Sequence, residues 1–334
     1  MRGRAVRVRT QDGEDAHRAM VRAGALDPTR KAKVEDGYLF LPLKEGVGGA
    51  MDLPPTYKVV EVDLEDRPVK PTSLKDAPDL PPELAAEVTR SMDMVGDIAV
   101  LKLKDDIRPR AAEIGDALMK VHPRLRAVAV DDGVVGELRL RSLDLVAGEG
   151  PLTTVHREHG VDLRVDLERA YFSPRLATEH RRVADMVREG ERMLDMFSGV
   201  GPFAVLAAKL GGPSEVHAID LNEVAVQLAR ENAASNGVAD IVTVHHGDAR
   251  QVVPGLGTFD RVVMNHPTMA IEFMDVALGA CREGSMVHLY LIGTEDEAMD
   301  IVASIDGARL VSSREVRTYA PGVSQWCLDL RVGH

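Results

Sequence analysis

The second half of the chain alternates short apolar runs with segments whose apolar residues recur every three or four positions. The short runs predict strands at RMLDMF, EVHAID, IVTVHH, FDRVVMN and MVHLYLI, and the longer segments predict helices at GPFAVLAAKL, NEVAVQLARENAASN, MAIEFMDVALGAC and EDEAMDIVASI. This repetition is typical of βαβ units, in which helices cover both faces of a parallel sheet. We therefore predict an α/β domain over 166–334, with RLVSSREVRTYA and SQWCLDLRV paired as a terminal hairpin.

The first half of the chain has a different pattern and predicts two smaller domains. The strand-like runs VRVRT and YLFLPL flank the helical segment DAHRAMVRAGAL, which indicates a small α/β module over 1–60. The stretch from Met51 to Pro82 is rich in proline and charge, so part of it is expected to be a linker. An α+β domain over 61–165 is predicted from strands at DIAVLKL and AVAVDD, a helix at PRAAEIGDALMKV, and two alternating segments, VVGELRLRSLDLVAG and TTVHREHGVDLRVDL.

Composition narrows the class of protein. No run of 18 apolar residues occurs, so no membrane span is expected, and the basic N-terminus lacks the apolar core of a signal peptide. Cys281 and Cys327 are far apart and have no His or Cys at ligand spacing, which predicts neither a disulfide nor a zinc site and favours the cytoplasm.

Charge leaves the kind of partner open. The net charge of −12 argues against a generic polyanion binder. Arginines nevertheless gather in small groups along the chain, and an acidic protein can still hold phosphates along one positive face. Ordinary solvated surface positions account equally well for most of these arginines.

Polar residues and glycines fall at the ends of successive predicted strands, where ligands bind in open α/β sheets. Gly199 and Gly201 form a turn before a helix that begins at Pro202, a position where a missing N–H costs little. Asp220 ends the second strand, where an acidic side chain can accept from ribose hydroxyls, and Asp248 follows the third, where it can accept from an adenine amino group. Each acid has a structural alternative, as a cap of a helix or turn, but their register predicts a nucleoside cofactor.

The motifs together resemble a known family. RAYFSPRLATEHRRVADMV, DMFSGVGPF, HAIDLN, VVMNHP and VRTYAPG are similar to those of the archaeal and eukaryotic tRNA guanine-N(1) methyltransferase family. The middle segments and GALDPTRKAKVEDGYLFLPL resemble the recognition domain and the small first domain of that family, so the likeness covers essentially the whole chain. It implies a Rossmann-like methyltransferase domain that methylates N(1) of the guanosine 3′ of the anticodon, tRNA position 37.

The resemblance also implies a cofactor, partners and site residues. The cofactor is S-adenosyl-L-methionine, and tRNA is the partner, held at its anticodon arm and outer corner. Apart from the resemblance, we expect a cytoplasmic monomer that needs no metal. Residues expected to bind the cofactor are Tyr171, Asp195, Phe197, Gly199, Gly201, Pro202, Asp220, Leu221, Asp248, Ala249 and Asn265.

Catalysis is expected to need a base, a group near O(6) of the guanine and an amide beside the reacting atoms. The resemblance assigns these tasks to Glu179, Arg139 and Asn265 respectively, with Arg141, Arg175 and Pro267 as further substrate-binding residues. Ser173 is predicted to cap a helix that begins at Pro174. Without the resemblance, Arg175 and Glu179 would be read as an exposed i,i+4 ion pair.

Two positions depart from the family pattern. His266 stands where the family has Leu between the Asn and the Pro, and His180 stands where it usually has Arg after the glutamate. These two departures are the only support for one alternative, a non-catalytic tRNA-binding homologue. Two wybutosine reactions at the same nucleoside are further alternatives: aminocarboxypropyl transfer, against which the intact Asn265, Pro267 and Glu179 favour methyl transfer, and methylation of the tricyclic intermediate, which stays open.

Overall fold

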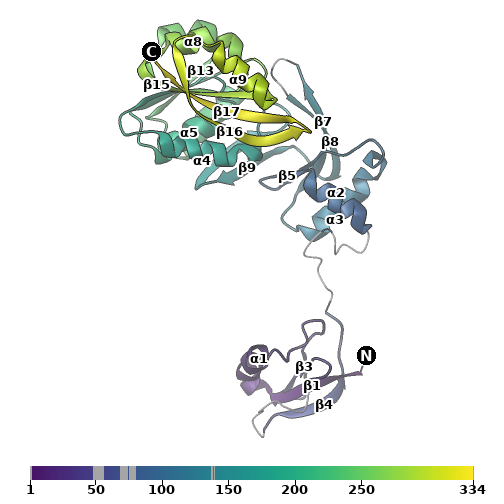
Figure 1. The fold of residues 1–334 in the computed structure, drawn as a ribbon. Helices are drawn as coiled ribbons and strands as arrows, with labels where there is room; N and C mark the ends of the chain where they lie inside the picture. Colours follow the sequence, from purple (N-terminus) through teal and green to yellow (C-terminus); the bar gives the residue numbers. More distant parts are fainter. Residues whose placement is uncertain are drawn as a thin grey trace. The chain divides into compact units, whose positions relative to one another are not determined.

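The structure is a computed structural model that describes residues 2–47, 56–67, 74, 80–136, 138 and 140–333. The described helices and strands fall into two compact units, Met1–Pro71 and Thr72–His334 (Figure 1). No helix in the described ranges is both long enough and apolar enough to cross a membrane.

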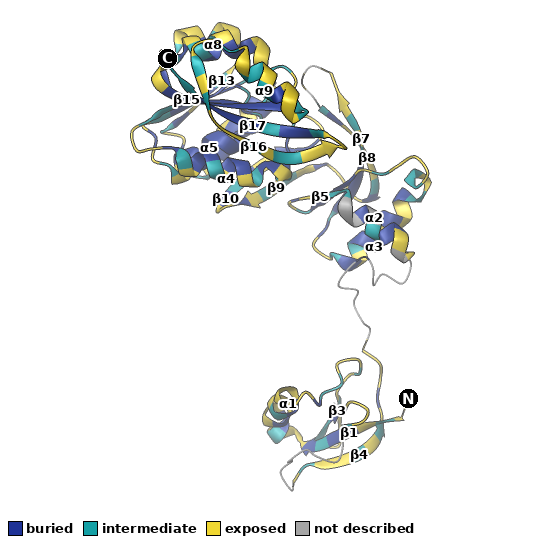
Figure 2. Ribbon diagram, viewed as in Figure 1, coloured by how far each residue is buried: buried dark blue, intermediate teal, exposed yellow. Residues whose placement is uncertain are grey.

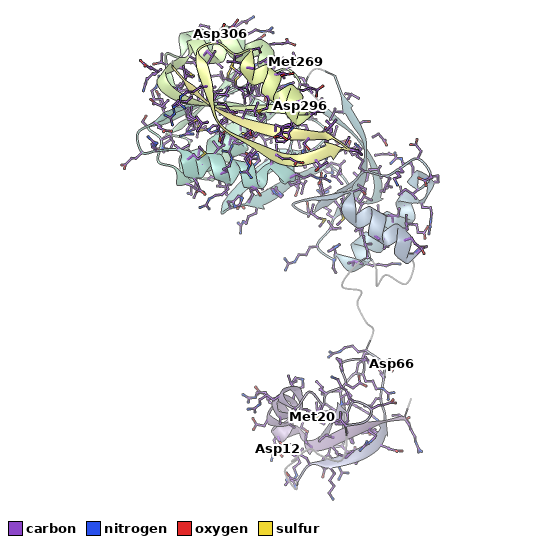
Figure 3. The ribbon with its side chains drawn as sticks, in the orientation of Figure 1. Asp12, Met20, Asp66, Met269, Asp296 and Asp306 are labelled. Carbon is purple, nitrogen blue, oxygen red and sulfur yellow. The ribbon has the colours of Figure 1, made fainter. Side chains whose placement is uncertain are left out.

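The first unit is a four-stranded antiparallel sheet with one helix. Its strand order is β2-β3-β1-β4, and its core includes Val6, Val8, Leu41 and the helix residue Met20. Figure 3 labels Met20 within this unit. The edge strand β4 extends this unit past residue 60, the predicted end of the module. The elements are β1 (Arg2–Arg9), α1 (Gly13–Arg22), β2 (Lys33–Glu35), β3 (Tyr38–Pro42) and β4 (Lys58–Asp63).

The second unit begins with a small sheet in the order β5-β6-β7-β8. Strands β6 and β7 are parallel and joined by α3, whose Ile114 and Leu118 are fully buried. The sequence predicted β6, α3, β7 and β8 but not α2 or β5. The elements are α2 (Pro82–Arg90), β5 (Met92–Val95), β6 (Ile98–Leu101), α3 (Ala111–Val121), β7 (Ala127–Val135) and β8 (Leu140–Gly148).

A hairpin of β9 (Thr153–Glu158) and β10 (Val161–Asp166) follows. It lies against the helices of the larger sheet, where the side-chain amide of Asn232 exchanges hydrogen bonds of 2.7 and 3.0 Å with the backbone of Arg164. Leu163 shares a core with Phe203 of those helices. This hairpin, expected in the middle domain, therefore packs with the C-terminal domain.

The C-terminal domain is a seven-stranded sheet in the order β13-β12-β11-β14-β15-β17-β16. Five strands are parallel, and β16 and β17 form the predicted antiparallel hairpin at one edge. The order reverses between β11 and β14, and such a reversal opens a crevice at the carboxyl ends of the strands. The strands are β11 (Arg192–Asp195), β12 (Glu215–Asp220), β13 (Val242–His246), β14 (Phe259–Met264), β15 (Cys281–Gly293), β16 (Ala308–Ala320) and β17 (Val323–Val332).

Helices cover both faces of this sheet, and each face has its own apolar core. Figure 2 shows the central strands buried and the outer helix surfaces exposed. Because side chains alternate along a strand, Cys327 of β17 joins the core under α4, α5 and α6, whereas Leu328 joins the core under α8 and α9. The helices are α4 (Ala177–Met186), α5 (Pro202–Leu210), α6 (Glu223–Ser235), α7 (Ala249–Val252), α8 (Met274–Gly279) and α9 (Glu295–Ala303).

Candidate active site

A cavity lies at the carboxyl ends of the parallel strands, where the strand order reverses. Its lining comes from the ends of β11, β12, β13 and β14 and the segments that follow them, together with Leu138, Tyr171, Leu176 and Gln325. Of the residues predicted to bind cofactor or substrate, those that line it are Tyr171, Phe197, Gly199, Asp220, Leu221, Asp248, Ala249, Asn265 and Pro267.

The turn after β11 needs its glycines. Gly199 has a φ of 52° and Gly201 a φ of 85°, the left-handed region that side chains with a Cβ rarely adopt. A Cβ on Gly199 would also lie 3.2 Å from the carbonyl oxygen of Tyr171. Gly201 and Pro202 shape the start of α5 and do not line the cavity.

Asp220 fixes that turn to the end of β12. Its carboxylate accepts hydrogen bonds from the backbone amides of Gly199, at 2.7 Å, and Asn222, at 2.8 Å. Burial raises the pKa of Asp220 above its ordinary value. The cap of α6 is Asn222, whose side chain accepts from Val224 N at 3.0 Å, so Asp220 is not the helix cap.

Asp248, by contrast, does have a structural role. It caps α7 by accepting from Arg250 N at 2.8 Å, and it also pairs with the Arg250 guanidinium at 2.6 Å. The hydrogen bond from the Arg250 side chain lowers the pKa of Asp248. A carboxylate held in this way at the cavity wall can still accept a further hydrogen bond from a ligand.

Asp195 and Ser198 carry polar atoms that the described part of the chain leaves unsatisfied. Both carboxylate oxygens of Asp195 and the hydroxyl of Ser198 are buried without a hydrogen-bond partner there. Burial raises the pKa of Asp195 to about 8. Asp195 ends β11 but does not line the cavity. A buried carboxylate without a partner fits a ligand with a cationic amino group, as S-adenosylmethionine has.

The segment after β14 presents Asn265 to the cavity. The amide oxygen of Asn265 is buried and has no partner among the described residues, so it remains available to a ligand. The ring of His266 packs edge-on against Phe197, with 5.3 Å between centroids, which gives this departure from the family pattern an aromatic contact. Pro267 anchors the turn, because its carbonyl accepts from Ile292 N of β15 at 3.3 Å.

Glu179 is buried and lines neither this cavity nor the one that holds Arg141 and Arg175. It is 1% exposed, and one carboxylate oxygen accepts from Tyr290 Oη at 3.0 Å and from Arg182 Nε at 2.9 Å. The other oxygen pairs with Arg314 Nη1 at 3.2 Å, and the Arg314 side chain is 40% exposed. The alternative of an exposed Arg175–Glu179 pair is wrong, since Arg175 pairs with Asp93 at 2.5 Å.

The predicted cap at Ser173 is also wrong. A 3₁₀ turn covers Pro174–Leu176 before α4 begins at Ala177, and Ser173 makes no side-chain cap hydrogen bond. Its hydroxyl instead accepts from Arg317 Nη1 at 3.4 Å.

A buried polar network extends from Glu179 into the domain. Arg182 joins Glu179 to Asp329 at 2.8 Å, and Asp329 accepts from His288 Nδ1 at 2.6 Å. Burial alone would raise the pKa of Asp329, but hydrogen bonds from His288 and Arg182 outweigh it and hold this pKa well below its ordinary value. We call Glu179, Arg182, Tyr290, His288 and Asp329 the Glu179 network.

His288, Cys327 and Asp329 lie close enough together to suggest a metal site. Their donor atoms are already engaged, however. His288 Nε2 accepts from Arg261 Nη1 at 2.8 Å, and Arg182 contacts both Cys327 and Asp329. Two arginines in these positions oppose a further cation, so hydrogen bonding accounts for this cluster.

A second cavity lies on the other side of Tyr171, between the middle sheet and the tip of the β16–β17 hairpin. Arg141 and Arg175 line this cavity rather than the first one. Arg141 is 9% exposed and donates to Phe172 O at 3.1 Å, which makes it partly structural. Arg139 lies outside the described residues.

His180, the second departure, is a buried core residue. Its Nδ1 bonds Glu158 of β9 at 2.7 Å, and its ring packs edge-on against Phe203 at 4.5 Å. It therefore ties α4 to the β9–β10 hairpin and contacts neither cavity.

Sequence reasoning did not find several residues of the site. Gln325 lines the first cavity from β17, and Arg317 lines the second from β16. The network residues Arg182, Tyr290 and Asp329 were missed because they are far apart in the chain and no local motif marks them. Arg250 also lines the first cavity. Its position two residues after the predicted site residue Asp248 was the only indication of this in the sequence.

The reversed strand order, the glycine turn and the acids at successive strand ends define a Rossmann-like, S-adenosylmethionine-dependent methyltransferase. Family models match residues 154–307 as the TRM5/TYW2 methyltransferase domain, 73–151 as the TYW2 N-terminal domain, and 5–51 as the tRNA methyltransferase 5 N-terminal domain. The chain belongs to the Trm5 family of tRNA (guanine(37)-N(1))-methyltransferases.

Three relatives illustrate the likeness. Trm5b of Pyrococcus abyssi, a tRNA (guanine(37)-N(1))-methyltransferase, is 36% identical over 338 residues, covering 98% of each chain. A complex of aTrm5 with tRNALeu superposes with a TM-score of 0.81 at 30% identity, covering 98% of this chain and 99% of that one. Taw21 of Saccharolobus solfataricus, a tRNA 4-demethylwyosine(37)-methyltransferase, is 32% identical over 206 residues, 61% of this chain and 78% of that one.

Proposed function

We propose that this protein transfers a methyl group from S-adenosylmethionine to N(1) of the guanosine at tRNA position 37. The carrying observation is the unsatisfied Asn265 amide beside a cavity whose walls come from successive strand ends. The relation to Trm5b over 98% of the chain supports the same substrate and reaction. We further propose that it acts as a cytoplasmic monomer that needs no metal.

When bound, the cofactor supplies an electrophilic methyl group on a sulfonium. Asp220 binds the ribose, Asp248 the adenine, and Asp195 the amino group, while Gly199 lets the ligand lie against the backbone. Asn265 accepts a hydrogen bond from the Watson–Crick edge of the extruded guanine, and Pro267 keeps that amide out of the sheet.

Glu179 is proposed to remove the N(1) proton as N(1) bonds to the methyl carbon and the carbon–sulfur bond breaks. Its Arg314-facing oxygen is the one to receive the proton, because the other is held by Arg182 and Tyr290. Arg314, half-exposed at the surface, must move for that oxygen to become accessible. The Arg139 role at O(6) stays a prediction from the family resemblance.

We also infer that the three predicted domains divide the work. Residues 166–334 together with the β9–β10 hairpin carry the chemistry, the rest of 61–165 holds the anticodon arm, and 1–60 recognise a distant part of the tRNA. A chain without residues 1–71 is expected to keep S-adenosylmethionine affinity and lose tRNA affinity. Unchanged tRNA affinity and selectivity would contradict this division.

A second candidate is methylation of the wybutosine intermediate at the same position, favoured by the likeness to Taw21. The test uses labelled S-adenosylmethionine with two unmodified transcripts, carrying guanosine or adenosine at position 37, and mass spectrometry of the product nucleoside. N(1)-methylguanosine from the first transcript and little product from the second are expected. Cofactor binding without transfer to guanosine would contradict the proposal and favour the later intermediate.

A further inference from the structure

Gln325 is a buried polar residue of the first cavity that the proposed mechanism does not use. It is 1% exposed and lies on β17 opposite Ile292 of β15. Ile292 in turn donates its backbone N–H to the carbonyl of Pro267. Gln325 is therefore held one strand away from the Asn265–Pro267 turn, and it lines the same cavity as Asn265 and Pro267.

The direction of the Gln325 amide is fixed by its neighbour. Arg317 Nε donates to Gln325 Oε1 at 2.9 Å. Since a guanidinium can only donate, the amide oxygen must face Arg317 and the amide nitrogen must point elsewhere. The described part of the chain gives that nitrogen no hydrogen bond, and Gln325 lines the first cavity.

Arg317 is itself held in place. Its Nη1 donates to Ser173 Oγ at 3.4 Å, and its guanidinium lies over the Tyr319 ring at 5.3 Å from the centroid. A cation stacked on an aromatic ring and bonded on two sides loses little further entropy when it orients a neighbour. Arg317 thus acts as a positioning residue for Gln325.

Asn265 and Gln325 offer complementary groups to one base. The free oxygen of Asn265 is an acceptor, and the free nitrogen of Gln325 is a donor. Guanine presents donors at N(1) and at its 2-amino group and an acceptor at O(6), whereas adenine presents an amino donor at position 6. A donor at this place would favour guanine and repel adenine.

We propose that Gln325 donates a hydrogen bond from Nε2 to O(6) of the target guanine and thereby selects guanosine over adenosine. The proposal rests on the proposed function and adds a residue that determines its specificity. The same contact strengthens as negative charge develops on O(6) during loss of the N(1) proton, so it also accelerates transfer.

The test measures single-turnover methylation of guanosine and adenosine transcripts with the full-length protein at saturating S-adenosylmethionine. Gln325→Met removes the donor and is expected to slow guanosine methylation about 10- to 100-fold, with cofactor affinity unchanged. Gln325→Glu keeps the contact with Arg317 but replaces the donor with an acceptor, so the ratio of adenosine to guanosine methylation should rise at least about tenfold. Ser313→Ala, exposed on β16, is the matched control.

Arg317→Met should reduce discrimination between the two transcripts while Gln325 remains, and Arg317→Lys should partly restore it. Wild-type discrimination in both Gln325 variants would overturn the inference, as would a rate loss matched by an equal loss of cofactor affinity. If Gln325→Met fails to fold, Gln325→Glu is enough for the test. An unchanged ratio of adenosine to guanosine methylation in that variant would overturn the inference. A wild-type chain that methylates no guanosine transcript would overturn the proposed function as well, which separates the two failures.

Discussion

The cofactor cavity and the Glu179 network are built in opposite ways. Most of the cavity lining comes from residues at or just after the ends of β11, β12, β13 and β14, which short local motifs set, whereas Tyr171 and Gln325 come from other parts of the chain. The network joins Arg182 of α4 to Asp329 of β17, which are 147 residues apart. Binding groups in this protein are thus encoded locally, whereas the support of the proposed base depends on the completed sheet.

The two regions also differ in how their charges are satisfied. Asp195 is buried without a described partner, while Glu179 and Asp329 each have several. Unsatisfied groups favour a ligand, and satisfied ones favour a rigid arrangement. Substitutions in the two regions should therefore separate ligand binding from stability and chemistry.

The largest effect is expected at Asp329. Asp329→Asn leaves Arg182 and His288 without their shared carboxylate, and removing one partner of a buried ion pair costs about 3–5 kcal/mol of unfolding free energy. Chemical denaturation measures this change. Asp185→Asn, from an exposed pair with Arg181, should cost less than about 1 kcal/mol as its control. Equal stability of the two variants would show that the network does not support α4.

A substitution at Asp220 tests the cofactor cavity without changing the Glu179 network. Asp220→Ala removes the acceptor of the Gly199 amide and the proposed ribose ligand. S-adenosylmethionine affinity should fall about 10- to 100-fold, while the rate at saturating cofactor stays near the wild-type value. Titration calorimetry with Glu223→Gln as control checks the affinity. Unchanged S-adenosylmethionine affinity together with a lower methylation rate would contradict the assignment of Asp220 to cofactor binding.

The raised pKa of Asp195 predicts that the stability of the ligand-free protein depends on pH. Because burial raises its pKa to about 8, the folded state retains a proton that the unfolded chain loses above its ordinary pKa near 4. Stability therefore falls as pH rises between these values, and Asp195→Asn removes this contribution. Relative to the variant, the wild-type melting temperature should fall by roughly 2–4 °C per pH unit between pH 5 and 8. Parallel curves would contradict the raised pKa.

The smallest effect is expected at Arg175, which is 44% exposed and lines the second cavity. Arg175→Met should change the unfolding free energy by less than about 1 kcal/mol. If this arginine meets a tRNA phosphate, the slope of log Kd against log salt concentration should decrease by about 1. An unchanged slope would limit Arg175 to its contact with Asp93.

Most of the fold could be predicted from the sequence because its patterns are local, and the residues that were missed depend on contacts between distant segments. Strand–helix alternation and a glycine turn are local, so the parallel sheet, the terminal hairpin and the family could be recognised from them. The prediction that Ser173 caps a helix was wrong because a serine before a proline is typical of a helix start, whereas the chain first forms a 3₁₀ turn there. Gln325 and Asp329 gain their roles only when β17 pairs beside β15, which no local pattern shows.

The single-turnover rate of Glu179→Gln at saturating S-adenosylmethionine tests most directly whether the network holds the base. Glutamine keeps the shape and can still accept from Tyr290 and Arg182, but it cannot serve as a base. The account predicts a rate about 10²- to 10⁴-fold below wild type, with cofactor affinity unchanged. A wild-type rate, or a loss explained by weaker cofactor binding, would contradict the assignment of Glu179 as the base.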